Sequence, residues 1–140
     1  MAHLSGGLHG ISTLLLLIAV AGCASPASMG RGAVTKEVSD IKELAGTWRG
    51  WVAAELPSQV TIMIREDGSY EGASRSGSRT VGRFFLDSGK VRYQSSRSAG
   101  AATLFDDNGR LFLIVVPDGT DAMGLTRSGT GRTELERVSR

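Results

Sequence analysis

The residues that most often carry acid–base or nucleophilic chemistry are few in this 140-residue chain, and they lie near its start. The only histidines are His3 and His9, and the only cysteine is Cys23. Beyond Cys23 the sequence therefore has no imidazole to act as a general base and no thiol nucleophile. Ser-His and Cys-His catalysis is excluded for that part of the chain, as are the usual His and Cys sites for zinc.

Carboxylates are the remaining candidates for chemistry, and they are densest at Asp106-Asp107-Asn108-Gly109. An EF-hand calcium loop needs acidic residues at alternating positions and a distant Glu, and this spacing is missing. A carboxylate pair for glycoside hydrolysis is compatible with the composition, but nothing in the sequence selects two residues for it. We interpret the cluster as a hairpin turn and expect no metal, no cofactor and no enzymatic activity.

Cys23 ends a leader that is apolar but too short to cross a membrane. The apolar run extends from Ile11 to Ala21, whereas a spanning helix needs about 20 residues. None of the 16 Lys and Arg or 14 Asp and Glu residues precedes Cys23. The ending Val20-Ala21-Gly22-Cys23 resembles the lipobox of bacterial lipoprotein signal peptides, in which the Cys becomes the acylated first residue of the mature protein. The resemblance implies a signal peptide over residues 1–22 and a lipid anchor on Cys23.

The residues after Cys23 indicate location and domain organisation. Ala24 stands where an Asp tends to retain lipoproteins in the inner membrane, so the resemblance implies the outer membrane, facing the periplasm, in a diderm bacterium. Residues 23–39 are rich in Ala, Ser and Gly and are predicted to form a flexible tether. Residues 40–140 are long enough for one domain with a modest core. The exported location removes nucleic acid as a partner.

From Gly46 onward, short alternating segments are separated by turn dipeptides. Asp67-Gly68, Ser88-Gly89 and Asn108-Gly109 each lie between apolar or β-branched runs, and such pairs supply the positive φ that tight hairpins need. Their regular spacing predicts an all-β, antiparallel up-and-down meander barrel of about eight strands. The predicted strands cover residues 46–54, 58–66, 69–75, 79–86, 90–96, 101–106, 110–116 and 121–128. A single helical turn is predicted over Asp40–Ala45, where it would cap one end of the barrel.

Two segments and a set of glycines can each be interpreted in more than one way. The run Leu111–Val116 is apolar on both faces, which indicates a strand covered on both sides or, less favoured, an exposed stripe that faces a partner. Segment 133–138 is interpreted as an edge strand or a loose end, because a ninth strand of a meander would meet the first in parallel. Glycines within the strands, including Gly82 and Gly100, are interpreted as bulges or bends that let a small barrel close.

The segment Leu44-Ala45-Gly46-Thr47-Trp48 resembles the opening of lipocalin-like (calycin) barrels, in which a helical turn leads into Gly-x-Trp on the first strand. In that family the Trp closes the barrel floor and an Arg from a late strand packs across its ring. The resemblance implies that Gly46, Trp48 and Arg127 form this closure, with Arg137 as the next candidate. The strands are shorter than those of true lipocalins, so a barrel filled by its own side chains remains an alternative to a hollow one.

Surface residues suggest where a partner would bind. Trp51 lies three positions after Trp48, so we expect the two rings on opposite faces of their strand. An outward Trp51 marks a contact surface, or else it packs under the predicted helical turn. A basic sector is also expected to contact anionic headgroups or cell-wall polymers. The alternative is that its charges are ordinary solvated surface charges. Its candidate residues are Arg75, Arg79, Arg83, Arg92 and Arg97.

These observations favour a lipid-anchored envelope protein that acts by binding. The preferred hypothesis is a non-catalytic module that contacts an envelope protein, a polymer or an anionic surface. The alternative is a carrier of a small apolar ligand or lipid inside the barrel, and an enzyme is the least favoured class. A continuous cavity of a few hundred Å³ would separate the carrier from a solid binding module.

Overall fold

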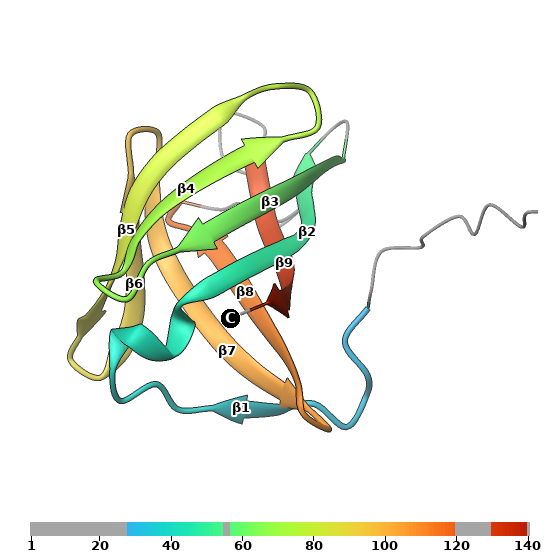
Figure 1. The fold of residues 1–140 in the computed structure, drawn as a ribbon, viewed down its shortest axis with the longest axis vertical. Helices are drawn as coiled ribbons and strands as arrows, with labels where there is room; N and C mark the ends of the chain where they lie inside the picture. The colour runs from blue at the N-terminus through green and yellow to red at the C-terminus, as the bar shows by residue number, and fades with distance from the viewer. Residues whose placement is uncertain (1–27, 55–56, 120–129, 140) are drawn as a thin grey trace, which may run out of the picture.

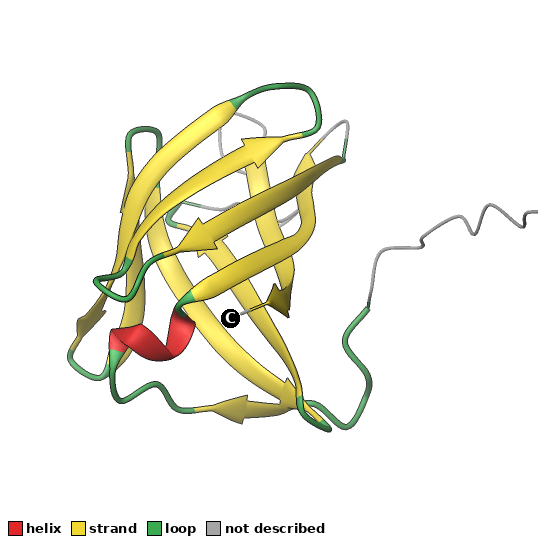
Figure 2. Cartoon of the chain, in the orientation of Figure 1, coloured by secondary structure: helices red, strands yellow, loops and turns green. Residues whose placement is uncertain are grey.

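A computed structural model describes residues 28–54, 57–119 and 130–139 and shows an almost entirely β-stranded molecule (Figures 1 and 2). One short 3-10 helix, η1, precedes the strands that form the barrel. The elements are β1 (Val34–Lys36), η1 (Ile41–Leu44), β2 (Gly46–Ala54), β3 (Ser58–Ile64), β4 (Ser69–Ser74), β5 (Arg79–Asp87), β6 (Lys90–Ser95), β7 (Ala99–Asp107), β8 (Arg110–Pro117) and β9 (Thr130–Ser139).

Strands β2 to β9 form a closed antiparallel barrel. Each strand pairs with the next along the chain, and β9 pairs with both β8 and β2. This architecture confirms the predicted up-and-down meander. Seven predicted strands correspond to β2 through β8 within two residues at each end, whereas the prediction for 121–128 lies outside the described residues.

The predicted hairpin dipeptides adopt the backbone conformations that they were expected to supply. Ser88 and Gly89 have φ values of 52° and 76°, and Asn108 and Gly109 have 55° and 88°. Both members of each pair are thus in the left-handed region, as a two-residue turn between twisted strands requires. In Asp67-Gly68 only Gly68, at 83°, has positive φ. These three turns lie at the same end of the barrel as η1, which we call the closed end.

The helical turn is confirmed at the closed end, and its sequence explains its limits. Asp40 caps η1 by accepting a hydrogen bond from the Lys42 amide, and Glu43 reaches back to the Asp40 amide in a capping box. Leu44 is fully buried, and its carbonyl accepts a 2.8 Å hydrogen bond from Trp48 Nε1. The turn therefore covers one end of the barrel, as expected.

Alternation along the strands sorts residues between the core and the outer face. Ile62 and Ile64 of β3 are buried, whereas Met63 between them is 55% exposed. On β8, the outward Phe112 and Ile114 are also buried, at 2% and 5%. The prediction that this strand is covered on both faces is thus confirmed at these two positions.

The prediction that segment 133–138 is an edge strand or a loose end is wrong. This segment belongs to β9, which is the eighth strand of the barrel, antiparallel to both neighbours. The prediction was wrong because it counted 121–128 as the eighth strand, which left the tail with a parallel partner. Closure by β9 satisfies the backbone hydrogen bonds of two strand edges.

The segment expected to be a flexible tether is docked over its second half. β1 pairs with the closed end of β7, with Thr35 opposite Phe105. The Gly30 amide donates a 2.8 Å hydrogen bond to the Asp107 carboxylate, and Val38 is buried. The tether interpretation is therefore wrong for residues 30–38, because these contacts hold them against the barrel.

Candidate functional site

A cavity of about 650 Å³ occupies the barrel interior at the end opposite η1. At this end β4 joins β5 and β6 joins β7; the two connections lie at the top of Figure 1. This volume falls within the ~300–1,000 Å³ range of small-molecule sites. The barrel is therefore hollow at this end, which we call the cavity end. Described residues lining it are Val52, Ser58, Val60, Ile62, Tyr70, Gly72, Ala73, Ser74, Ser76, Ser78, Arg79, Thr80, Phe84, Tyr93, Ser95, Arg97, Ser98, Val115, Pro117, Gly131 and Thr133.

The inner part of the cavity is apolar because β-branched and aromatic residues alternate inward along its strands. Val60 and Ile62 come from β3, Phe84 from β5 and Val115 from β8. Below them the core continues to Trp48 and the closed end. This part of the cavity has side chains suited to an apolar group of a ligand.

Two glycines make room for the two tyrosine rings of the cavity. Tyr70 lies opposite Gly82 across β4 and β5, and Tyr93 lies opposite Gly100 across β6 and β7. A Cβ at either glycine would come within 2.7 Å of the facing ring. The strand register continues through both positions without a bulge, so the bulge interpretation is wrong for Gly82 and Gly100. The absence of a Cβ at each glycine leaves room for the facing tyrosine ring.

Aromatic packing and hydroxyl contacts hold these tyrosines. The Phe84 ring centroid lies 5.0 Å from that of Tyr70 and 6.1 Å from that of Tyr93. The Tyr93 hydroxyl lies 3.2 Å from Ser98 Oγ. Burial raises the pKa of both tyrosines above its ordinary value of 10.0, so both phenols are neutral hydrogen-bonding groups at physiological pH.

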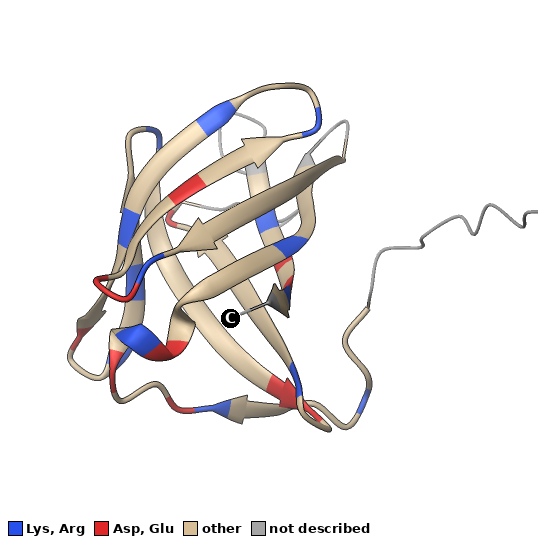
Figure 3. Cartoon of the chain, viewed as in Figure 1, with Lys and Arg blue, Asp and Glu red and all other residues tan. Residues whose placement is uncertain are grey.

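Towards the cavity end, the lining becomes polar and basic. Its hydroxyl-bearing residues there include Ser76 and Ser78 from the β4–β5 turn and Ser98 from the β6–β7 turn. Arg79 begins β5, and Arg97 lies in the β6–β7 turn. Figure 3 shows basic residues at this end of the β4–β5 and β6–β7 connections.

The basic sector predicted from the sequence divides into two groups. Arg79 and Arg97 line the cavity, and Arg75 directly follows β4 at the same end. Arg92 instead forms a bidentate pair with Asp118 on the outside of the barrel, at 2.7 and 3.3 Å. Arg83 lies 3.8 Å from the Asp67 carboxylate. The five arginines therefore do not form one free basic surface.

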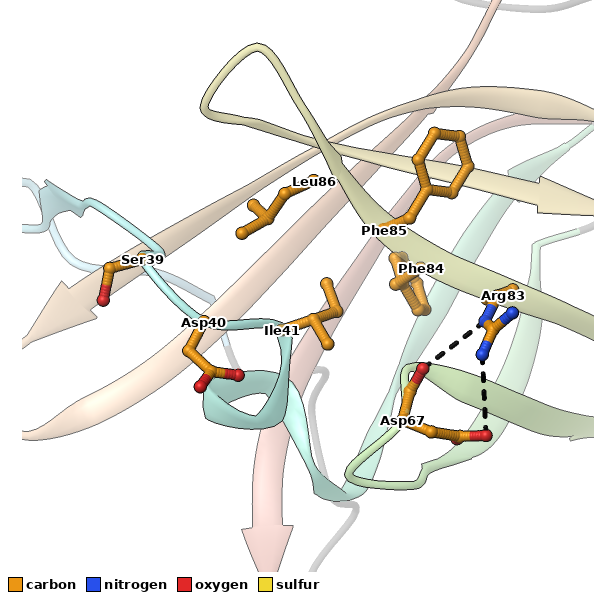
Figure 4. A pocket seen from close by; sticks show the side chains of 8 residues that line it. All are labelled: Ser39, Asp40, Ile41, Asp67, Arg83, Phe84, Phe85 and Leu86. Carbon is orange, nitrogen blue, oxygen red and sulfur yellow. Dashed lines mark hydrogen bonds and ion pairs between the residues drawn. The ribbon is translucent and has the colours of Figure 1, made fainter.

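A second hollow, of about 550 Å³, lies outside the barrel between η1 and β5 (Figure 4). The Arg83 guanidinium faces Asp67 at one side of it, and Phe85 and Leu86 contribute partly exposed apolar surface. Described lining residues are Ser39, Asp40, Ile41, Asp67, Arg83, Phe84, Phe85 and Leu86. This groove is more open than the interior cavity and carries an ion pair at one side.

At the closed end, Trp48 is fully buried and Arg137 of β9 covers its ring, with the guanidinium carbon 4.6 Å from the ring centroid. Arg137 Nη2 also donates a hydrogen bond to the Glu43 carbonyl. Arg127, the first candidate from the sequence, lies outside the described residues. Gly46 begins β2 with a φ of 133°, at the junction between η1 and the barrel.

Two further residues were singled out from the sequence, Trp51 and Cys23, and two residues of the cavity were missed. Trp51 is partly exposed on the outer face, opposite Gln59 of β3 and Glu134 of β9, rather than at η1. Cys23 lies outside the described residues. Sequence reasoning did not identify Tyr70 and Tyr93 as lining a cavity. The sequence did indicate that each tyrosine faces inward, because each lies at an inward position of an alternating strand. It did not show which residues face the tyrosines, because that is set by how the strands pair.

The fold and the interior site define a small, closed antiparallel β-barrel with a ligand-sized cavity. Comparisons with family models, curated proteins and solved structures give no match to this chain. In the described ranges, no helix is long and apolar enough to cross a membrane. Those ranges also hold no group of three or more His, Cys, Asp or Glu residues arranged to bind a metal ion.

Proposed function

We propose that this protein is a non-catalytic binding protein that holds a small molecule inside its barrel. The cavity of about 650 Å³ carries the proposal, because it provides an apolar inner surface and polar groups at one end. Small-molecule sites combine these two features, the apolar part supplying affinity and the polar part orientation. The proposal favours the carrier alternative over the surface-binding hypothesis preferred from the sequence.

The chemistry of the lining supports binding rather than catalysis. No described residue of the cavity is Asp, Glu, His or Cys. Burial raises the pKa of Tyr70 and Tyr93, which moves both phenols away from the range in which they could serve as bases near neutral pH. The available groups exchange hydrogen bonds or offer apolar surface, as a binding site requires.

We also propose that Cys23 is acylated and anchors the protein in the cell envelope, at the outer membrane of a diderm bacterium. Six residues separate Cys23 from Gly30, whose amide contacts Asp107 at the closed end. Extended chain spans at most ~3.6 Å per residue. An anchor at Cys23 would therefore lie within about 25 Å of the closed end. Fatty-acid labelling that is lost in Cys23→Ser supports acylation, and equal labelling of both forms contradicts it.

A neutral fluorescent probe, N-phenyl-1-naphthylamine, tests whether the cavity binds small molecules. Full-length protein carrying Cys23→Ser is the parent, so that no attached acyl chain competes. Val60→Trp fills the cavity from β3 and should weaken probe binding at least about tenfold. Met63→Trp is the matched control, because Met63 lies on the outer face of the same strand and is 55% exposed. Equal binding by the two variants would contradict an interior site.

Binding of an envelope partner on the outer surface is the second candidate function. Exposed apolar side chains favour it, because Val81 and Phe85 lie on the outer face of β5 and are 56% and 38% exposed. Retention on anionic vesicles and isolated cell wall, measured from low to high salt, tests this candidate. Retention that is lost in Phe85→Ser supports it, whereas release by salt alone would assign the retention to exposed charges. No retention at low salt contradicts it.

A further inference from the structure

We infer that the cavity selects an amphiphile with an oxyanion at one end and an apolar body at the other. Phosphate, sulfonate and carboxylate groups share the relevant chemistry. The inference rests on the proposed function and adds the chemical class of the ligand. It follows from how charge, hydrogen-bond donors and apolar surface are distributed along the cavity.

The charge of the cavity favours an anion. Among its described lining residues, Arg79 and Arg97 are the only ionised side chains, and no carboxylate accompanies them. Among these described lining residues, a cationic ligand would meet two positive charges and no carboxylate, whereas an anion would be attracted by both arginines. The positive charge of the lining thus disfavours cationic ligands and favours anionic ones.

Arg79 and Arg97 differ from most arginines on the barrel wall. Arg65, Arg83, Arg92, Arg110 and Arg132 each form an ion pair, with Glu71, Asp67, Asp118, Glu136 and Glu134 respectively. Within the described part of the chain, neither Arg79 nor Arg97 has such a pair. The pKa of Glu71 is lowered mainly by Arg65 and only weakly by Arg79. Both guanidinium groups at the cavity end are therefore available to an external anion.

Hydroxyl groups near these arginines complete a set of donors. Ser76 and Ser78 lie in the β4–β5 turn, just before Arg79. Ser98 follows Arg97 in the β6–β7 turn. Guanidinium groups bind oxyanions through paired N–H donors, and serine hydroxyls donate single hydrogen bonds. A phosphate, sulfonate or carboxylate accepts several such bonds at once. The cavity end therefore has the chemistry of an oxyanion site.

The inner surface requires a second, apolar part of the ligand. Val60, Ile62, Phe84 and Val115 offer no hydrogen bond to a charged group. A charge placed among them would lose its hydration without compensation. A free inorganic anion would use only the arginines and hydroxyls. An amphiphile uses both parts, with its oxyanion at Arg79 and Arg97 and its apolar body deeper in the barrel.

Two probes that differ by one sulfonate test the inference in the Cys23→Ser full-length protein. N-phenyl-1-naphthylamine is neutral, and 8-anilinonaphthalene-1-sulfonate has the same ring system with an anionic group. We expect the sulfonate probe to bind more tightly to the parent protein. Combined Arg79→Gln and Arg97→Gln should weaken its binding at least about tenfold and change that of the neutral probe by less than about twofold.

Arg83→Gln is the matched control, because Arg83 pairs with Asp67 at the closed end and does not line the cavity; it should leave both affinities unchanged. Retained binding of the neutral probe shows that the double variant is folded. If the double variant keeps the parent's affinity for the sulfonate probe, the oxyanion site is refuted. If the parent binds neither probe, the proposed function itself fails.

Competition against the bound sulfonate probe distinguishes a free anion from an amphiphile. Dodecyl phosphate, kept below its micelle concentration, should displace the probe at concentrations at least about tenfold lower than inorganic phosphate or dodecanol. Displacement by inorganic phosphate at equal concentration would identify a small-anion site and overturn the amphiphile. Equal displacement by dodecanol would show that the anionic group contributes nothing, which also overturns the inference.

Discussion

Arg137 and Trp48 lie directly opposite each other where β9 meets β2, and the Arg137 guanidinium covers the buried indole at 4.6 Å from the ring centroid. The same indole donates its N–H to the Leu44 carbonyl, and Arg137 donates to the Glu43 carbonyl. These three contacts together join the barrel's first and last strands to η1. We expect the stability of the closed end to depend on them.

Arg137→Ala should lower the free energy of unfolding by about 2 kcal/mol, because it removes a cation–π contact and a charge-assisted hydrogen bond. Arg137→Lys should cost less, since it keeps the charge but loses the planar guanidinium. Urea unfolding followed by tryptophan fluorescence measures both. Arg132→Ala is the control on the same strand. Its ion pair with Glu134 is exposed, so it should change stability by less than about 0.5 kcal/mol. Equal effects of Arg137→Ala and Arg132→Ala would contradict the role of the Trp48 contact.

Glu43→Gln should destabilise the protein near neutral pH and have little effect in acid. Hydrogen bonds from the amides of Asp40 and Ser39 lower the pKa of Glu43 from its ordinary value of 4.5. A lowered native pKa gives stability that is present above the unfolded value and is lost as pH falls through the native one. Urea midpoints of both proteins at pH 7 and at about pH 3 measure the difference. A difference that stays constant over this range would disprove the linkage.

Alkaline titration should show both tyrosines ionising later in the folded protein than in the unfolded chain. Tyr70 and Tyr93 are the only tyrosines in the sequence, and burial raises the pKa of each above 10.0. Because the neutral phenol is the form favoured by folding, stability should fall as pH rises above the unfolded pKa of about 10. Tyrosinate absorbance, with and without denaturant, reports the shift. Coincident titration curves would refute it.

Gly100→Ala should destabilise the barrel by about 1–3 kcal/mol through overpacking. Its Cβ would lie 2.1 Å from the Val116 carbonyl oxygen and 2.7 Å from the Tyr93 ring. Gly32→Ala serves as the control, because a Cβ there meets nothing within 4 Å; its effect should stay within about 0.5 kcal/mol. Thermal or urea unfolding compares the two. Similar stability of both variants would mean that Tyr93 and β8 can move aside.

Local patterns in the sequence were sufficient to predict the meander. The pairs Ser88-Gly89 and Asn108-Gly109 specify tight turns through their own backbone preferences, and alternation along β3 specifies which side chains face inward. These signals act over a few residues. They predicted the positions of seven barrel strands and the capping turn at Asp40, whereas the place of Trp48 at the barrel floor was implied by the resemblance to lipocalin-like barrels.

Long-range pairing could not be predicted in the same way. Arg137 was only the second candidate for the Trp48 contact, because its place opposite Trp48 depends on the register of β9 against β2 across most of the chain. The docking of residues 30–38 was missed for a similar reason. Those residues have little apolar periodicity, and their position depends on the edge of β7 and on the Asp107 carboxylate.

The sequence by itself determined the strand-and-turn order, the inward faces of the strands and the capping turn, because backbone preference and alternating polarity are local properties. Only the tertiary structure decided that β9 closes the barrel, that Gly82 and Gly100 accommodate Tyr70 and Tyr93, and that the interior is hollow. Closure and cavity volume depend on how distant strands pair and on which side chains then meet across the barrel. No local sequence pattern contains that information.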